Sequence, residues 1–352
     1  MGIKSRIAWY RGRQKARHFL ARFDEWRAKP SWEVGDHQGL LQAFLQSGGS
    51  ALSTASDRYG AVQERHAFDD KPSSIGLRPG TKDYEQALNQ LREEGFTILP
   101  WRLDESMAEK LSQHLEGPKM TLRSDDPAIN GRKAYLDLNN PEAEKYDVPL
   151  AHILSSPQAV ELMLDRGIMS LAQDYLGSVP RIDICASWFS FPVQRASSEA
   201  ATMFHFDLDR TKWLKVFFFL TDVTSSTGAH VFLPGTHRDG GIPIQLRKLG
   251  YSRLSDNLVR SSFPEENWTT VSGPRGTILI EDTRGIHKGI PVLQGHRLVL
   301  QFQYSQNLFG GKPSVLGADI LESDAITRFG ALYPEVLQGM TGNFELRPEV
   351  LS

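Results

Sequence analysis

The chain has 352 residues, of which 40% are hydrophobic and 23% are charged, and its formal net charge at pH 7 is −2. This is an ordinary globular composition, long enough for one large domain with extensions or for two domains. The nearly neutral charge gives no sign of a nucleic-acid partner. The single cysteine, Cys185, excludes a disulfide framework within the chain and fits a reducing compartment. No apolar run reaches the ~20 residues that span a bilayer, and the N-terminus lacks the apolar stretch of a secretory signal, so we expect a cytoplasmic protein.

Residues 1–80 are predicted to form a basic, helical extension. Within residues 1–30, nine lysines and arginines stand against two acidic residues. Phe19, Phe23 and Trp26 fall at helical spacing among them. The favoured interpretation is a solvated helix whose aromatic stripe docks on the rest of the protein. The alternative is a basic amphipathic helix that makes a peripheral contact with an anionic membrane surface.

The segment after the extension is predicted to be mostly helical. Helical patterning is found at 38–46 within the extension and, after the extension, at 83–94, 104–115 and 158–176. Asp104 is expected to cap the amino-terminal end of its helix, and Gly177 is expected to follow the last helix of this segment. Residues 96–99 have the pattern of a strand. The polar, turn-rich stretch 118–150 predicts a lid or a substrate loop.

From Arg181 onward the apolar period changes from helical spacing to alternation. Short apolar runs recur at 181–189, 215–220, 230–233, 277–280 and 297–304. Clusters of glycine, proline and serine separate them, which is typical of an antiparallel sandwich or barrel. Helices from the N-terminal half are expected to lie against one sheet. Residues 311–352 are expected to form a C-terminal helical segment packed on the core, with a helix near 321–332.

Three polar positions in this second half point to metal chemistry. His205 and Asp207 are two residues apart, and His287 and then Arg297 follow farther along the chain. In a strand, the side chains of His205 and Asp207 leave the same face, and a histidine from a distant strand can complete the set. Two imidazoles and one carboxylate can occupy one face of Fe(II) and leave three positions open. Arginine offers a fixed fork for a carboxylate, and a metal beside such a clamp is what 2-oxoglutarate requires.

The residues around these positions resemble the phytanoyl-CoA dioxygenase family of Fe(II)/2-oxoglutarate oxygenases. The resemblance is carried by the segments 215–223 and 228–237, begins near Tyr84 and residues 95–100, and ends at about Tyr304. A His-x-Asp pair by itself is also common at the polar end of a strand. The resemblance implies a double-stranded β-helix (a jelly roll, cupin-like) in a mainly β, α+β domain over residues 81–310.

The same resemblance implies roles for individual residues. His205, Asp207 and His287 are identified as the Fe(II) ligands. Halogenating relatives have a small residue at the position of Asp207, so its presence favours hydroxylation or a related oxidation. Arg297 occupies the position of the family's arginine and is expected to grip the distal carboxylate of 2-oxoglutarate. Lys215 occupies a position where relatives often place a second co-substrate contact, and a solvent-facing strand residue is an equal alternative.

Further residues are candidates for contact with the substrate. His230 alternates with apolar neighbours, and an interior histidine with satisfied hydrogen bonds is favoured over a substrate contact. Arg210 follows the ligand pair and could meet an anionic substrate, although arginines in loops are mostly solvated. Trp188 and Ser187 belong to the strand leading toward the ligands, and one of them is expected to line the pocket, with Trp188 the candidate for contact with the substrate. His237 is expected to be structural, and Asp282 is expected either to orient a ligand imidazole or to cap a loop.

Together these patterns predict a dioxygenase that uses Fe(II), 2-oxoglutarate and O₂. It is expected to hydroxylate a C–H bond of a small molecule, sugar-linked or lipid-linked. One alternative is a cupin-like protein that binds a metal or ligand without turnover. A second is a metal-dependent isomerase on the same scaffold, in which Arg297 would have no obvious role. The sequence does not indicate the oligomeric state.

Overall fold

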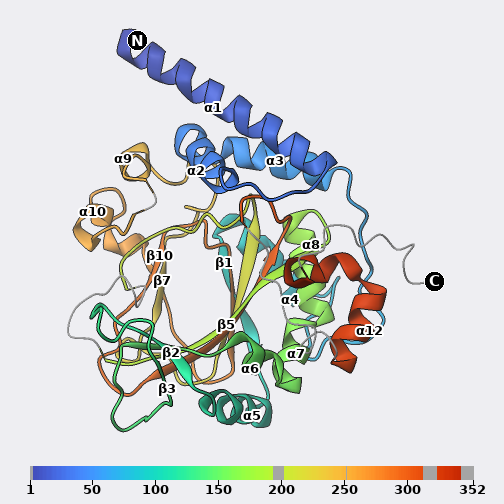
Figure 1. The fold of residues 1–352 in the computed structure, drawn as a ribbon, viewed down its shortest axis with the longest axis vertical. Helices are drawn as coiled ribbons and strands as arrows, with labels where there is room; N and C mark the ends of the chain where they lie inside the picture. Colours follow the sequence, from blue (N-terminus) through green and yellow to red (C-terminus); the bar gives the residue numbers. More distant parts are fainter. Residues whose placement is uncertain (1–2, 193–201, 251, 312–322, 342–352) are drawn as a thin grey trace.

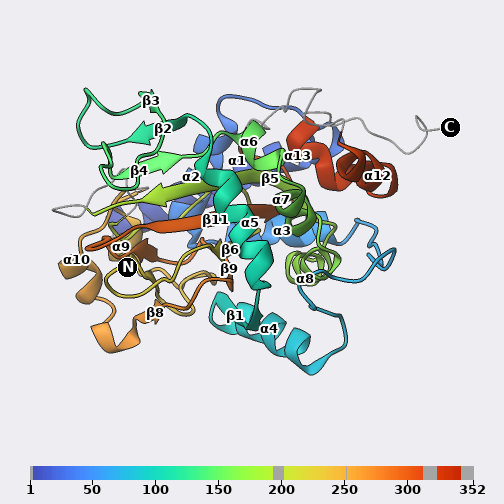
Figure 2. The same ribbon diagram turned by 90° about the horizontal axis from the view of Figure 1, so that it is seen from below.

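In the computed structural model, residues 3–192, 202–250, 252–311 and 323–341 are described, with the backbone alone for residues 3–13. Two antiparallel sheets form the centre (Figures 1 and 2). In spatial order the large sheet consists of β1 (Phe96–Arg102), β9 (Thr277–Glu281), β6 (Trp213–Phe219), β11 (Arg297–Ser305), β5 (Arg181–Ser190), β4 (Lys145–Asp147), β2 (Met120–Arg123) and β3 (Lys133–Ala134). The small sheet consists of β10 (His287–Gly289), β7 (His230–Phe232) and β8 (Thr269–Val271).

Helices cover one face of the large sheet. They are α4 (Lys82–Glu93), α5 (Glu105–Glu116), α6 (Leu150–Leu154), α7 (Pro157–Met163), α8 (Arg166–Leu176) and α12 (Asp324–Leu332). Because side chains alternate along a strand, Val216 and Phe218 of β6 join the core beneath these helices. Phe217 and Phe219 leave the opposite face and line a cavity. The predicted antiparallel β core with helices against one sheet is therefore confirmed.

The C-terminal segment also packs on this core. Its helix begins at Asp324 with Ser323 as the cap, and residues 321–322 of the predicted helix lie outside the described residues. A short 3₁₀ helix (Pro334–Leu337) and α13 (Gln338–Thr341) follow. Gly339 lies so close to β5 that a Cβ there would be 2.3 Å from the carbonyl oxygen of Ile182. Only glycine permits this approach of the two backbones.

Two local predictions need correction. The helix predicted at 158–176 is two helices, because the Asp165 carboxylate accepts a hydrogen bond from Ile168 N (3.0 Å) and starts α8. Gly177 does end α8, with φ of 78°, and Asp104 does cap α5. The segment 118–150 is not only a loop, since β2, β3 and β4 within it extend the large sheet. The elements missed from the sequence are α3 (Ser50–Gly60), α9 (Ile244–Arg247), α10 (Asp256–Arg260), β8 and β10.

The N-terminal extension forms a helical layer of α1 (Ile3–Ala28), α2 (Asp36–Ser47) and α3. The rings of Phe19, Phe23 and Trp26 are buried around Phe309, with ring centroids 5.8, 5.3 and 5.8 Å from it. The predicted docking of the aromatic stripe is therefore confirmed. The amino-terminal end of α1 extends beyond the rest of the molecule (Figure 1). None of the helices in the described ranges is long and apolar enough to cross a membrane.

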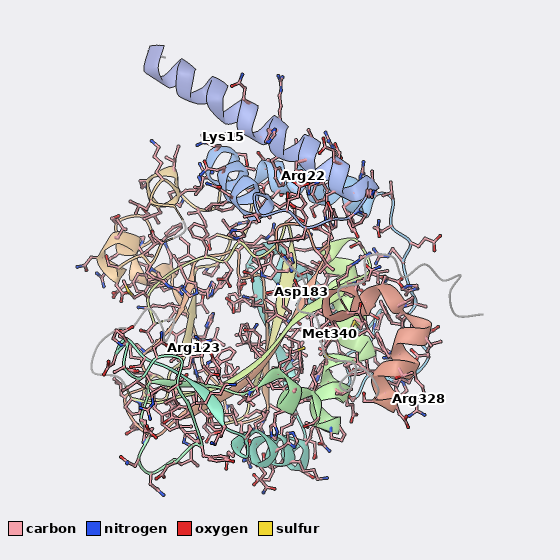
Figure 3. The ribbon with its side chains drawn as sticks, viewed as in Figure 1. Lys15, Arg22, Arg123, Asp183, Arg328 and Met340 are labelled. Atoms are coloured by element: carbon pink, nitrogen blue, oxygen red, sulfur yellow. The ribbon has the colours of Figure 1, made fainter. Side chains whose placement is uncertain are left out.

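A polar contact holds the helices of this layer together, and an aromatic contact joins the layer to the segment of the predicted ligands. Arg22 of α1 (Figure 3) donates from Nε to Oδ1 of the buried Asp36 at 2.8 Å. Phe44 of α2 lies against Phe206, with ring centroids 5.4 Å apart. Phe206 lies between His205 and Asp207 in the sequence. Through this ring contact, α2 therefore packs against the segment that carries the predicted ligand pair.

We predict that the docked aromatic stripe stabilises the fold. Phe23→Ala should lower the free energy of unfolding by about 3–5 kcal/mol, the usual effect of removing a buried ring, and deletion of residues 1–30 should lower the melting temperature further. Thermal unfolding followed by circular dichroism measures both. Trp32→Ala is the matched control, because the Trp32 side chain is 44% exposed. Equal melting temperatures for Phe23→Ala and Trp32→Ala would contradict the packing role.

Candidate metal centre

The three predicted ligands are brought together by two short segments that hydrogen-bond to each other. His205 N donates to His287 O at 2.9 Å, and His287 N donates to His205 O at 2.8 Å. Asp207 N donates to Thr283 O at 2.8 Å. His205 therefore lies in a short bridged segment outside any longer strand, while His287 opens β10. Side-chain ligand atoms of His205, Asp207 and His287 all lie within 4.8 Å of one another.

The hydrogen bonds of the two imidazoles leave the correct nitrogen free for a metal. Nδ1 of His205 lies 2.9 Å from Met203 O, and Nδ1 of His287 lies 3.0 Å from Gly285 O. Because a carbonyl oxygen only accepts, each Nδ1 carries the proton and each Nε2 presents a lone pair. Burial, with His287 nearby, lowers the pKa of His205 to about 3, and burial also lowers the pKa of His287. Both rings are therefore neutral at pH 7, as metal binding requires.

The Asp207 carboxylate lies between the imidazoles and a lysine. Its Oδ1 is 3.8 Å from Nε2 of His205, and its Oδ2 is 3.8 Å from Nε2 of His287. Lys215 Nζ donates to Oδ2 at 2.6 Å. Burial alone would raise the pKa of Asp207, but the positive charge and the hydrogen bond of Lys215 oppose burial and hold this pKa well below its usual range. The carboxylate is therefore ionised and available as a ligand.

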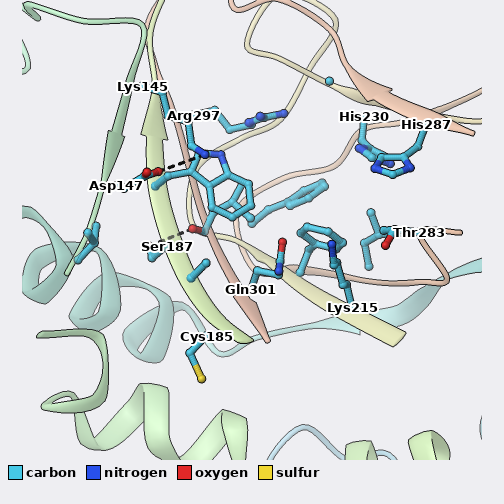
Figure 4. A pocket seen from close by; sticks show the side chains of 18 of the residues that line it. Lys145, Asp147, Cys185, Ser187, Lys215, His230, Thr283, His287, Arg297 and Gln301 are labelled. Carbon is cyan, nitrogen blue, oxygen red and sulfur yellow. Dashed lines mark hydrogen bonds and ion pairs between the residues drawn. The ribbon is translucent and has the colours of Figure 1, made fainter. Parts of the chain in front are cut away.

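These ligands line one cavity of about 450 Å³ between the two sheets (Figure 4). Arg297, Lys215, His230 and Trp188 line the same cavity. The other lining residues are Lys145, Asp147, Val148, Leu150, Cys185, Ala186, Ser187, Phe217, Phe219, Leu279, Thr283, Gly289, Val299 and Gln301.

Arg297 brings a positive charge into this cavity without a carboxylate partner in the described part of the chain. Its Nη1 donates to the carbonyl oxygen of Gly228, and its Nε is buried without a hydrogen-bond partner. Burial lowers the pKa of Arg297 to about 10, so the guanidinium remains charged at pH 7. A buried charge of this kind is costly unless an anion pairs with it. The cavity therefore contains a site suited to a carboxylate.

Arg210 is not brought to this cavity. Its Nε donates to Oδ2 of Asp183 at 2.7 Å, and both side chains are buried. Asp183 also accepts hydrogen bonds from Ser305 Oγ at 3.0 Å and from Gln303 Nε2 at 3.1 Å. The expected contact of Arg210 with a substrate is therefore replaced by a buried structural ion pair.

Asp282 and His237 have structural roles. The Asp282 carboxylate accepts hydrogen bonds from Tyr175 Oη at 2.5 Å and Arg284 Nη2 at 2.6 Å. It therefore holds the loop before His287 and does not orient the ligand ring itself. His237 Nε2 lies 3.3 Å from Arg92 O, which agrees with the predicted structural role.

A buried acid beside the ligands was not predicted from the sequence. Glu281 has no exposed surface, and its Oε1 lies 3.0 Å from Nε2 of His230. The His230 ring lies next to the rings of His287 and Phe217, at centroid distances of 5.5 and 6.2 Å. The alternation of residues 277–280 was the available signal, since it places Glu281 on the same inward face as Leu279.

One wall of the cavity comes from the segment predicted as a lid or a substrate loop, although the strand that carries it was not predicted. Lys145 Nζ lies 3.1 Å from Asp147 Oδ1 and 4.8 Å from the centre of the Trp188 ring (Figure 4). Arg123 Nε donates to Asp147 Oδ2 at 2.7 Å. The charged groups of this wall are therefore paired, in contrast to Arg297.

The described residues fit a metal and a dicarboxylate. Two neutral imidazoles and an ionised carboxylate are a suitable donor set for Fe(II). The buried Nε of Arg297, which has no partner, suits an anion in the same cavity. A metal bound at the two Nε2 atoms would leave the hydrogen bonds of the Nδ1 atoms unchanged.

No protein-family model matches the chain, and no curated protein matches its sequence. Several solved structures are similar. The epimerase SnoN, in complex with Fe3+, alpha ketoglutarate and nogalamycin RO, has 18% identity over 63% of this chain and 82% of its own, with a TM-score of 0.43. EvdO2 from Micromonospora carbonacea var. aurantiaca, complexed with 2-oxoglutarate, has 19% identity over 64% of this chain and 92% of its own, with a TM-score of 0.44. HygX from Streptomyces hygroscopicus, with nickel and 2-oxoglutarate bound, has 19% identity over 67% of this chain and 92% of its own, with a TM-score of 0.44.

Proposed function

We propose that the protein is a non-haem Fe(II)- and 2-oxoglutarate-dependent dioxygenase, related to the phytanoyl-CoA dioxygenase family and built on a double-stranded β-helix. One observation carries the proposal. His205, Asp207 and His287 converge within 4.8 Å in a cavity that also holds the Arg297 guanidinium, which has no carboxylate partner in the described ranges. A structural metal site would use the three ligands and leave Arg297 without a role.

Each residue has a defined task in this proposal. His205, Asp207 and His287 hold Fe(II) on one face and leave three positions open. Arg297 binds the distal carboxylate of 2-oxoglutarate and fixes its distance from the metal. When bound, iron supplies the chemistry that couples oxidation of 2-oxoglutarate by O₂, giving succinate and CO₂, to oxidation of a substrate C–H bond. The surrounding cavity excludes water from that bond.

The substrate is proposed to be a small molecule that is hydroxylated on carbon. The cavity volume of about 450 Å³ falls within the range of small-molecule sites. Phe217, Leu279 and Val299 provide apolar walls, and the paired charges of Lys145 and Asp147 stand at another part of the lining. This combination suits a molecule with both polar and apolar parts, for which we propose a sugar-linked or lipid-linked compound.

Anaerobic titration tests the proposed function. Purified protein is loaded with Fe(II) and titrated with 2-oxoglutarate while the weak visible metal-to-ligand band is followed, and succinate is measured after O₂ is admitted. We expect a saturable band and succinate formation. Binding of both reagents without succinate, including in a single turnover, would indicate a binding protein. Fe(II) binding without a 2-oxoglutarate band would instead favour a metal-dependent isomerase.

For the cellular location, we propose a cytoplasmic protein whose basic helix α1 makes a peripheral contact with anionic membranes. Its support is the excess of lysine and arginine in residues 1–30 and the extension of the amino-terminal end of α1 beyond the body (Figure 1). Each basic residue near such a surface contributes about 1 kcal/mol. Flotation with phosphatidylserine vesicles at low and high salt tests this contact. Intact protein that stays in the soluble fraction at low salt would refute it.

A further inference from the structure

We propose that Lys215 is a positioning residue that makes Asp207 bind the metal through one carboxylate oxygen. The ammonium of Lys215 engages Oδ2 of Asp207 at 2.6 Å and is itself held by Oδ2 of Asp209 at 3.3 Å. This inference rests on the proposed function, because it concerns the same metal centre. It differs from the sequence-based expectation, in which Lys215 contacts the co-substrate directly.

The fold fixes the ammonium in this place. Lys215 lies on β6, between Glu281 of β9 and Gln303 of β11 in the strand register. Only 9% of its surface is exposed. The ammonium has acidic partners on the segment that carries the metal ligands, so it stays at the carboxylate of Asp207.

The chemical consequence concerns the coordination number. A carboxylate has two oxygens and can coordinate a metal through one or both. If Asp207 used both, it would occupy one of the three positions that a 2-oxoacid and O₂ need. A charge-assisted hydrogen bond from Lys215 to Oδ2 competes with the metal for that oxygen and leaves Oδ1 as the ligand.

The same arrangement sets the charge around the metal. Asp207, Asp209 and Lys215 together carry one negative charge. Removing the ammonium would leave two negative charges beside a divalent cation and would also remove the repulsion between ammonium and metal. Interactions between unit charges a few ångströms apart amount to about 4 kcal/mol at the effective dielectric of a protein surface. Loss of Lys215 should therefore strengthen metal binding while it worsens the coordination geometry.

The test uses Mn(II) as the metal probe and the full-length protein. Lys215→Met should bind Mn(II) at least about tenfold more tightly than wild type in calorimetric titration, which corresponds to about 1.4 kcal/mol. Water-proton relaxation should show one fewer water on the bound Mn(II), because Asp207 then uses both oxygens. Lys215→Arg, which keeps the cation, should return both readouts toward wild type. Lys145→Met removes another cation of the cavity and should leave both unchanged.

Asp209 provides a second, independent variant. Asp209→Asn keeps the ammonium at Asp207 but removes a negative charge, so Mn(II) should bind several-fold more weakly than in wild type. Unchanged Mn(II) affinity and water count in Lys215→Met, with weaker 2-oxoglutarate binding, would overturn the inference in favour of a direct co-substrate contact. If wild type does not bind Mn(II) at all, the proposed function fails first, and this inference fails with it.

Discussion

Replacing any one of His205, Asp207 and His287 with alanine is expected to abolish metal binding and succinate formation. Their ligand atoms lie within 4.8 Å of one another, and a metal held by two protein ligands would lose its fixed face. Removing residues that only support metal ligands typically costs 10–100-fold in affinity, so loss of a direct ligand should exceed about 100-fold. Calorimetric Fe(II) titration under anaerobic conditions measures the affinity, and succinate production measures turnover.

A buried histidine outside the cavity provides the matched control for this experiment. His237→Gln alters a ring that contacts Arg92 O and does not line the cavity. It should lower thermal stability while keeping Fe(II) affinity within a few-fold of wild type. If all three alanine variants keep both Fe(II) affinity and succinate formation, the metal centre lies elsewhere and the assignment of these ligands is wrong.

Arg297→Met is expected to raise the 2-oxoglutarate concentration needed for half-saturation by at least about tenfold, with little change in Fe(II) affinity. The guanidinium is the cation of the cavity that lacks a carboxylate partner among the described residues. Each hydrogen bond to a charged group contributes about 1.5–3 kcal/mol, and about 1.4 kcal/mol corresponds to a factor of ten. Titration of the visible band measures binding of 2-oxoglutarate separately from turnover.

Two further variants sharpen the interpretation of Arg297. Arg297→Lys keeps the charge but loses the planar fork, so its half-saturation should lie between those of wild type and Arg297→Met. Lys145→Met removes a cation that is already paired with Asp147, and its 2-oxoglutarate dependence should stay close to that of wild type. Unchanged 2-oxoglutarate binding in a folded Arg297→Met variant would place the carboxylate clamp at another residue.

The convergence of His205, Asp207 and His287 could be expected from the sequence, because these residue types suit one metal and the surrounding segments resemble a known oxygenase family. His205 and Asp207 had to leave one face, and His287 needed only to come from another strand. The geometry places all three together. Arg210 shows where this reasoning ends. Its position in a loop after the ligand pair indicated a solvent-exposed side chain. In the structure Arg210 pairs with Asp183 of β5, a carboxylate that is distant in the sequence and that only the folded sheet brings beside it.

Other parts of the site depend on long-range contacts that leave little trace in the local pattern. Glu281 could have been suspected from the alternation of β9, whereas its pairing with His230 requires the two sheets to meet. The charged wall of Lys145 and Asp147 lies in a segment whose polar composition indicated a loop. Short strands such as β4 form because a neighbouring strand offers them hydrogen bonds, and neighbours cannot be read from local propensity.

The contact between Phe44 and Phe206 bears on the smallest piece of this protein that can be expressed alone. The sequence predicts a domain boundary near residue 80, and a shortened chain that begins at residue 81 would keep every predicted metal ligand. It would also expose the rings of Phe206 and Phe309 to water, since α1 and α2 cover them. Such an apolar patch promotes aggregation. A shortened chain that keeps these rings covered therefore includes α2, α3 and the part of α1 from just before Phe19 onward.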